Sequence, residues 1–298
     1  MAGTDGPVYV LASGPGAVFF LIAPQTSRSP LVARYDVHTH DMATGPRIQG
    51  AADLAYAGGS LWVSAGVQSS AKQPAGTKLY RLNPSTLQIA DTFSMPKPVM
   101  PLLPTPAGLW SGSDGDLYLV DPASGAIKRT VAVTGSVGQL AWEKTNHLLY
   151  DSTHRSGFAD AFAVEERSAA SGALVVRSTR LRNVPSINSL ASTPDGVWVS
   201  YATGMMGTSE LDQRSDLQRA GAPIEGGNGM LTSIADGILW IAPYRGLQCA
   251  DPATGQVRSD VPKVAGFWTS EVVAVGSNVF AGGFRGLVKI HPGPNCTG

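Results

Sequence analysis

Cysteine and histidine are scarce in this chain of 298 residues, which contains two cysteines and five histidines. Cys249 and Cys296 lack the spacing of metal ligands and neither belongs to a Cys-x-x-Cys pair, which argues against zinc-finger and thioredoxin-like sites. An even pair of cysteines is compatible with one disulfide in an exported protein or with two thiols in a cytoplasmic one. We expect a secreted or extracytoplasmic mature domain, with a cytoplasmic protein as the alternative.

Charged residues are also sparse, at 15% of the chain, and 22 basic residues balance 22 acidic ones. The chain therefore lacks the positive surface of a nucleic-acid-binding protein or of a basic membrane patch. No apolar run approaches the roughly 20 residues of a membrane-spanning helix. Residues 1–7 also lack the basic and apolar regions of a secretion signal. We expect no nucleic-acid partner, no membrane span and a monomer.

Glycine and proline are abundant instead, with 35 and 21 residues respectively. Such a high content of turn-forming residues opposes long helices and favours short strands joined by tight turns. The composition therefore predicts an all-β protein.

A short pattern recurs along the whole chain: a turn containing Gly, Asp or Asn, followed by an aromatic residue within an apolar run, as in Asp195-Gly196-Val197-Trp198-Val199. The aromatic anchors are separated by 43, 48, 40, 48, 42 and 40 residues. They are Phe19, Trp62, Trp110, Tyr150, Trp198, Trp240 and Phe280. Aromatic residues at a fixed place in a repeat usually pack in the core, so we assign these seven to the fold rather than to a site.

A second signal follows several anchors, a strand that ends in Asp-Pro or Asn-Pro and a small polar residue. It occurs at Asn83-Pro84-Ser85, Asp121-Pro122-Ala123-Ser124-Gly125 and Asp251-Pro252-Ala253-Thr254-Gly255. These residues suit a tight turn between two strands. Four antiparallel strands in roughly 40–45 residues, repeated along a chain, are typical of a β-propeller.

We therefore predict a single all-β domain, a seven-bladed β-propeller of four-stranded antiparallel blades. The blades are placed at about 7–50, 51–96, 97–135, 136–183, 184–226, 227–265 and 266–298. The last blade has room for three strands, and few residues precede Val8 to supply a fourth. A Cys249–Cys296 disulfide would attach the C-terminal tail to the third strand of the preceding blade.

The segment Asp116-Leu117-Tyr118-Leu119-Val120-Asp121-Pro122-Ala123-Ser124-Gly125 resembles the YVTN-type and quinoprotein-type propeller repeats of bacterial proteins. A more distant likeness is to propellers of the virginiamycin B lyase type. Their Trp-Phe-Thr repeat is missing here, and only Phe267-Trp268-Thr269 is similar to it. The resemblance implies a propeller fold, which hosts binding proteins, lyases, hydrolases and dehydrogenases alike.

In such a fold, the loops between the second and third strands crowd one mouth of a central channel. Four of these loops carry an arginine at a matching position, and two place an aromatic residue before it. The residues are Arg28, Arg155, Tyr244-Arg245 and Phe284-Arg285. Guanidinium groups bind carboxylate, phosphate or acidic sugars. The alternative is that each arginine pairs with a carboxylate of a neighbouring blade or donates to carbonyl groups of its own loop.

The loops that enter each blade add Asn188, Asn228, Trp268 and Thr269 to this predicted ligand site. Amide and hydroxyl groups would orient a polar ligand, and Trp268 would offer an apolar wall, unless it packs between blades. The insertion Val67 to Thr77 is a candidate lid, with surface decoration as the alternative.

Catalysis would depend on His154, the one histidine expected at this mouth, and on Glu271 as its partner. Together they could move a proton next to a carboxylate held by the arginines, as in a lyase or isomerase. The alternative for His154 is an exposed loop residue. His38 and His40 alternate like metal ligands but are expected in a turn on the opposite face, so we predict no metal site.

The sequence thus predicts a binding protein for a small anionic or polar ligand, or for a protein partner, at the channel mouth. A lyase or isomerase acting on a carboxylate-bearing substrate is the alternative, and no cofactor is identified. A quinone-dependent dehydrogenase would need a calcium-held cofactor and more acidic ligands than the sequence offers. Sequence motifs of serine hydrolases, zinc proteases and nucleotide-binding enzymes are missing.

Overall fold

The computed structural model describes most of the chain. The described residues are 2–3, 6–23, 29–66, 77–154, 162–177, 186–203, 208–215, 218–219, 224–226, 231–242, 246–261, 269–284, 286–291 and 294–296. Among these residues, no helix has the length and hydrophobicity needed to cross a lipid bilayer.

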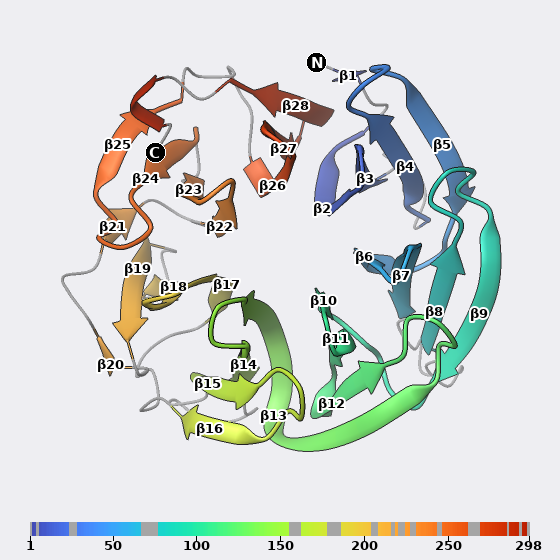
Figure 1. The fold of residues 1–298 in the computed structure, drawn as a ribbon, viewed down its shortest axis with the longest axis horizontal. Coiled ribbons are helices and arrows are strands. Elements are labelled where there is room, and N and C mark those ends of the chain that lie inside the picture. Colours follow the sequence, from blue (N-terminus) through green and yellow to red (C-terminus); the bar gives the residue numbers. More distant parts are fainter. Residues whose placement is uncertain are drawn as a thin grey trace.

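The fold is all-β and propeller-like: antiparallel sheets, most of them four-stranded, are arranged around a centre (Figure 1). In three of these sheets the strands follow one another in chain order from the inside outwards. They are β2 (Val8–Gly14), β3 (Ala17–Ile22), β4 (Leu31–Asp36) and β5 (Met42–Arg47); β6 (Ala51–Ala57), β7 (Ser60–Gly66), β8 (Thr77–Leu82) and β9 (Ile89–Met95); and β22 (Leu231–Ala235), β23 (Ile238–Ala242), β24 (Gln248–Ala250) and β25 (Val257–Asp260).

A fourth sheet has five strands, three of which (β18, β20 and β21) pair with β19. Its strands are β17 (Ile187–Thr193), β18 (Gly196–Thr203), β19 (Thr208–Ser215), β20 (Gln218–Arg219) and β21 (Ile224–Gly226).

The largest sheet has seven strands because one long strand, β13, takes part in two pairings. Its strands are β10 (Leu102–Thr105), β11 (Gly108–Gly112), β12 (Asp114–Val120), β13 (Ile127–Glu143), β14 (Leu148–His154), β15 (Phe162–Ser168) and β16 (Leu174–Arg177). The first part of β13 pairs with β12 and the last part pairs with β14, and the change of partner occurs at Ser136. One continuous strand thus forms the outer edge of one group of strands and the inner edge of the next.

The last sheet differs from the sequence-based expectation of three strands. β26 (Thr269–Val275), β27 (Asn278–Gly283) and β28 (Gly286–Ile290) are joined by β1 (Ala2–Gly3), which pairs with β28. The two residues of β1, which precede Val8 in the chain, are enough to pair with the outer edge of β28. Beyond β28, a short 3-10 helix, η1 (Pro294–Cys296), carries Cys296, which is disulfide-bonded to Cys249 on β24, as hypothesised from the sequence.

The seven aromatic anchors are all buried, and each lies on the second strand of its group, as predicted. Two of them also make hydrogen bonds beyond their own group of strands: the indole Nε1 of Trp110 donates to the carbonyl of Ala169, just after β15 of the same seven-stranded sheet, and that of Trp198 donates to the carbonyl of Pro252 in the neighbouring sheet, both at 2.8 Å. The repeat pattern therefore reports packing within and between sheets.

The predicted Asp-Pro and Asn-Pro turns connect third and fourth strands. In the β24–β25 turn, Oδ1 of Asp251 accepts hydrogen bonds from the backbone N–H groups of Ala253 and Thr254, and Gly255 has a φ of 72°. A side chain at that φ would be strained, which explains the glycine. His38 and His40 lie in or beside the corresponding β4–β5 turn, where Asp36 caps the backbone.

Candidate functional site

A cavity of about 460 Å³ lies where the innermost strands meet, and its lining comes from β2, β6, β10, β13, β17, β22 and β26. Apolar residues make up the larger part of the lining, and residues with polar side chains are interspersed among them. They include Tyr9, Asp53, Gln139, Asn188, Thr232 and Glu271. A cavity of this size with apolar walls and few polar groups has the character of a small-molecule site.

Bulges near the start of the innermost strands help to shape this lining. The pairing register shifts between Val8 and Val10 in β2, and equivalent shifts occur in β6, β13, β17 and β26. A bulge adds one unpaired residue and re-aims side chains. Tyr9 and Asn188 are bulge residues, and both line the cavity.

The residue after the bulge links neighbouring sheets in three places. Oδ2 of Asp53 accepts a hydrogen bond from the backbone N–H of Leu102 at 2.7 Å. Oε2 of Glu271 accepts one from Leu11 at 2.7 Å. Oγ of Ser189 accepts one from Thr232 at 2.8 Å. On its strand, each acceptor lies two residues before the residue that pairs with the aromatic anchor of the next strand. The three side chains therefore occupy the same position of the repeat.

Burial perturbs the acidic groups of the cavity, and the charge of Asp53 adds to the effect on Glu271 and Tyr9. Desolvation, with a smaller contribution from the charge of Asp53, raises the pKa of Glu271 to about 8, although the hydrogen bond from Leu11 opposes the shift. Desolvation likewise raises the pKa of Asp53 to about 6, against the hydrogen bonds from Leu102 and Leu54. Burial and the charge of Asp53 raise the pKa of Tyr9 to about 12. The site therefore contains two carboxyl groups that change charge near neutral pH.

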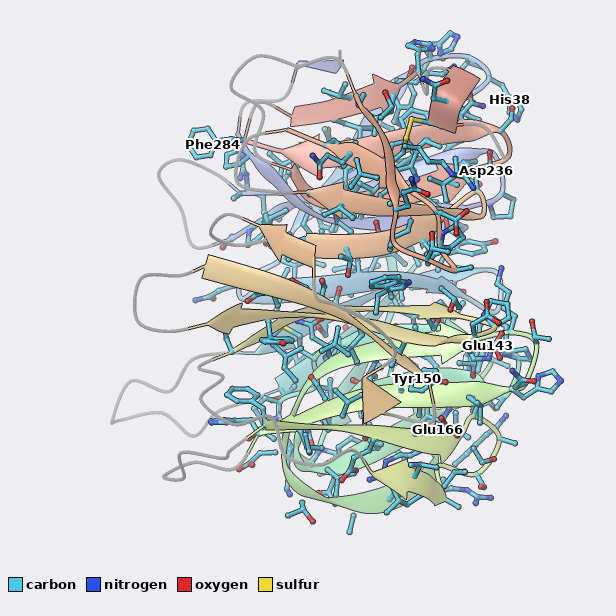
Figure 2. The ribbon with its side chains drawn as sticks, turned by 90° about the vertical axis from the view of Figure 1, so that its left-hand side faces the viewer. His38, Glu143, Tyr150, Glu166, Asp236 and Phe284 are labelled. Carbon is cyan, nitrogen blue, oxygen red and sulfur yellow. A yellow bond between two sulfur atoms is a disulfide. The ribbon has the colours of Figure 1, made fainter. Side chains whose placement is uncertain are left out.

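The two acidic residues lie toward one end of the cavity. Figure 2 places Phe284, in the β27–β28 loop, at one end of the molecule and places Glu143, where β13 ends, at the other. The innermost strands therefore begin near the Phe284 end. Asp53 and Glu271 follow the first residues of β6 and β26, whereas Ala55 and Val273, further along the same strands, present apolar lining.

The structure brings two of the predicted site residues, Glu271 and Asn188, into the cavity. His154 lies at the end of β14 with its ring stacked on Phe162, 4.4 Å between centroids, and it is not part of the cavity lining. Phe284 is 67% exposed at the end from which the innermost strands begin, and Thr269 is the first residue of β26.

The other predicted ligand-binding residues lie outside the described residues, as do residues 67–76 of the candidate lid. These residues are Arg28, Arg155, Asn228, Tyr244, Arg245, Trp268 and Arg285. Their proposed role at the channel mouth stays a prediction.

Sequence reasoning missed Asp53, Tyr9, Gln139 and Thr232, because it searched the loops rather than the strands that enclose the cavity. A signal was available for Asp53, an acidic residue within the apolar run Ala51-Ala52-Asp53-Leu54-Ala55. Carboxylates are seldom placed in an apolar strand without a partner or a function.

No protein-family model and no curated protein matches this sequence. Solved structures do resemble the fold. Kuenenia stuttgartiensis hydrazine synthase matches with a TM-score of 0.72 at 14% identity, covering 98% of this chain and 97% of that one. The computationally designed Ika8 protein matches with a TM-score of 0.64 at 13% identity, covering 98% of both chains.

KlAtg21, in its complex with the coiled-coil of AgAtg16, matches with a TM-score of 0.64 at 11% identity, covering 97% of this chain and 96% of that one. The TM-scores show that the fold is shared. At sequence identities this low, the likeness carries no conclusion about activity.

Proposed function

We propose that this protein binds a small polar molecule in the central cavity, and that the molecule enters from the end at which Phe284 lies. The observation that carries the proposal is the convergence of Tyr9, Asp53, Asn188 and Glu271 on a cavity of about 460 Å³ with otherwise largely apolar walls. Small-molecule sites are built in this way, because apolar walls provide affinity and a few polar groups provide orientation.

We also propose that the architecture is a seven-bladed propeller. The seven-stranded sheet corresponds to two blades that share β13, since its first part pairs as an outer strand and its last part pairs as an inner one. Seven buried aromatic anchors on seven second strands support this count. The resemblance to YVTN-type and quinoprotein-type repeats belongs to the same proposal, as does export of the protein, which the Cys249–Cys296 disulfide favours.

Acid–base catalysis in the same cavity is a second candidate function, and Glu271 is the reason. A carboxyl group with a pKa of about 8 exists in both protonation states near neutral pH, which suits a general acid or base. A lyase or isomerase reaction would use Glu271 to exchange a proton with a bound substrate. His154, as its partner, would have to act from outside the described lining of the cavity.

Filling the cavity tests the binding proposal. Ala52 lies in the lining, and Ala52→Trp would occupy much of the space, whereas Ala90→Trp places the same side chain on exposed strand β9. Thermal unfolding would be followed with a panel of amines, alcohols, sugars, carboxylates, phosphates and divalent metals. A compound that binds only the folded protein raises the melting temperature.

We expect at least one compound to stabilise the wild-type protein and the Ala90→Trp variant but not the Ala52→Trp variant. Stabilisation that survives Ala52→Trp would place binding elsewhere and contradict the proposal. With a hit in hand, loss of turnover but not of binding in Glu271→Gln would favour the catalytic candidate, and His154→Ala would test its predicted partner.

A further inference from the structure

We infer that the ligand of the central cavity carries a positively charged nitrogen, which binds between the carboxyl groups of Asp53 and Glu271. This inference rests on the proposed binding function and names the chemical class of the ligand. It follows from the charged groups that are present in the described lining of the cavity and from the lack of basic groups among those described residues.

The acidic groups of the cavity have no counter-charge among the described residues. Asp53 and Glu271 belong to strands on either side of β2, and both line the same space. No lysine, arginine or histidine belongs to the described lining, and neither carboxyl group forms an ion pair with a described basic residue. Charged groups in protein interiors are ordinarily paired, because desolvation of an isolated charge is costly.

The hydrogen bonds that these carboxyl groups already make do not neutralise them. Backbone N–H groups of Leu11, Leu54 and Leu102 bind one oxygen of Glu271 and both oxygens of Asp53. These bonds fix the direction of the carboxyl groups, and they add no positive charge. After desolvation, the negative charge of Asp53 is a further cause of the raised pKa values of both Glu271 and Tyr9.

At neutral pH Asp53 is mostly charged and Glu271 mostly protonated, so an ammonium group in the cavity would pair with Asp53 and favour loss of the proton from Glu271. It would donate to carboxylate oxygens that the backbone has already oriented, so little ordering of side chains would be needed. The titratable groups of the described lining are Asp53, Glu271, Tyr9 and Tyr56. The hydroxyl of Tyr9 already donates to the carbonyl of Ala51, and the ring of Tyr56 stacks on Phe19, so the two carboxyl groups are the groups on which recognition of a cation would depend. The volume of about 460 Å³ is large enough for a small organic cation and much larger than a bare metal ion would fill.

Charge-matched compounds test this inference. Choline would be compared with its neutral isostere 3,3-dimethylbutan-1-ol, and benzylamine with benzyl alcohol and benzoate, by calorimetric titration at low ionic strength. We expect each cation to bind at least tenfold more tightly than its neutral or anionic counterpart. Choline has a charge that does not titrate, so its affinity should rise between pH 6 and pH 9 as Glu271 loses its proton.

Variants complete the test. Asp53→Asn and Glu271→Gln keep the size and a hydrogen-bond acceptor, and the double variant should lose at least tenfold in cation affinity. Asp41→Asn removes one negative charge from an exposed turn and should change nothing. The pH dependence in the wild-type protein provides a second readout if the double variant folds poorly.

Two outcomes separate this inference from the binding proposal. If alcohols or carboxylates bind as tightly as the cations, and Ala52→Trp abolishes their binding, the inference is wrong and the cavity is still a ligand site. If no compound responds to Ala52→Trp, both are wrong.

Discussion

Two pairs of acidic side chains lie inside this protein under opposite conditions. Asp151 and Glu165, both fully buried, flank Arg167, whose side chain is 4% exposed. The Nε of Arg167 lies 2.9 Å from Oδ2 of Asp151, another guanidinium nitrogen binds Glu165, and a third donates to the carbonyl of Gly172. Asp53 and Glu271, by contrast, surround a cavity and bind only backbone N–H groups in the described part of the chain.

The first arrangement is a structural use of buried charge, and the proposed function assigns the second to ligand binding. In the first pair, the protein itself supplies the counter-charge, and the cluster holds β14 and β15 together. In the second pair, backbone N–H groups orient the carboxyl groups, and no described residue supplies a counter-charge; we propose that a ligand does. Three substitutions test this distinction, beginning with the largest expected effect.

Glu271→Gln should change the pH dependence of stability most. The pKa of Glu271 is about 8 in the folded protein and near the ordinary 4.5 when unfolded. Between these pH values, the folded state retains a proton that the unfolded chain has released, so the wild-type protein loses stability as the pH rises. The loss attributable to this group is at most roughly 5 kcal/mol, from about 1.4 kcal/mol per pKa unit.

Urea denaturation at pH 5, 7 and 9 would measure this dependence. Glu271→Gln keeps the acceptor for the N–H of Leu11 and should flatten the curve, so that the variant exceeds the wild-type protein in stability at pH 9. Asp41→Asn, in an exposed turn, is the control and should follow the wild-type curve. Parallel curves for Glu271→Gln and wild type would mean that this carboxyl group is not desolvated.

Arg167→Met should destabilise the protein by about 3–5 kcal/mol at pH 7, because it leaves two buried carboxylates without their guanidinium group. Arg129→Met is a matched control, since Arg129 is exposed and donates only to the carbonyl of Ser171 in the described structure. Equal losses of unfolding free energy in the two variants would show that the Arg167 cluster does not carry the stability assigned to it.

Ser189→Ala should have the smallest effect, about 1–2 kcal/mol, since it removes a neutral acceptor from the buried N–H of Thr232. Ser189 occupies the same repeat position as Asp53 and Glu271, but it does not titrate near neutral pH. The loss should therefore be equal at pH 5 and pH 9. A pH-dependent loss in this variant would show that the pH dependence comes from the inter-sheet hydrogen bonds rather than from the carboxyl groups.

Local signals in the sequence predicted the parts of the fold that local interactions determine. The aromatic anchors and the Asp-Pro turns each depend on a few adjacent residues, and the structure places them in buried second strands and third-to-fourth-strand turns. The pairing of β1 with β28 was not predicted, because it joins residues at opposite ends of the chain.

The residues of the cavity were predicted only in part, because the cavity too is formed by residues that lie far apart in the sequence. Glu271 and Asn188 were identified from their expected place in the repeat, and both line the cavity. Asp53 and Tyr9 were missed, because their access to the cavity depends on bulged strands packed around a common centre. No pattern of neighbouring residues predicts that arrangement. The acidic residue Asp53 in an apolar strand was nevertheless a signal that this position could belong to a site.

The most direct measurement is the titration of Glu271 by carbon-13 NMR of carboxyl-labelled glutamate, with the resonance assigned from the Glu271→Gln variant. We predict a pKa of about 8 in the free protein, since burial disfavours the charged form. Saturating choline should lower that pKa, because a bound cation stabilises the carboxylate. A Glu271 pKa near 4.5 that choline leaves unchanged would contradict the central claim, which is that the oriented carboxyl groups of this cavity bind a cationic ligand.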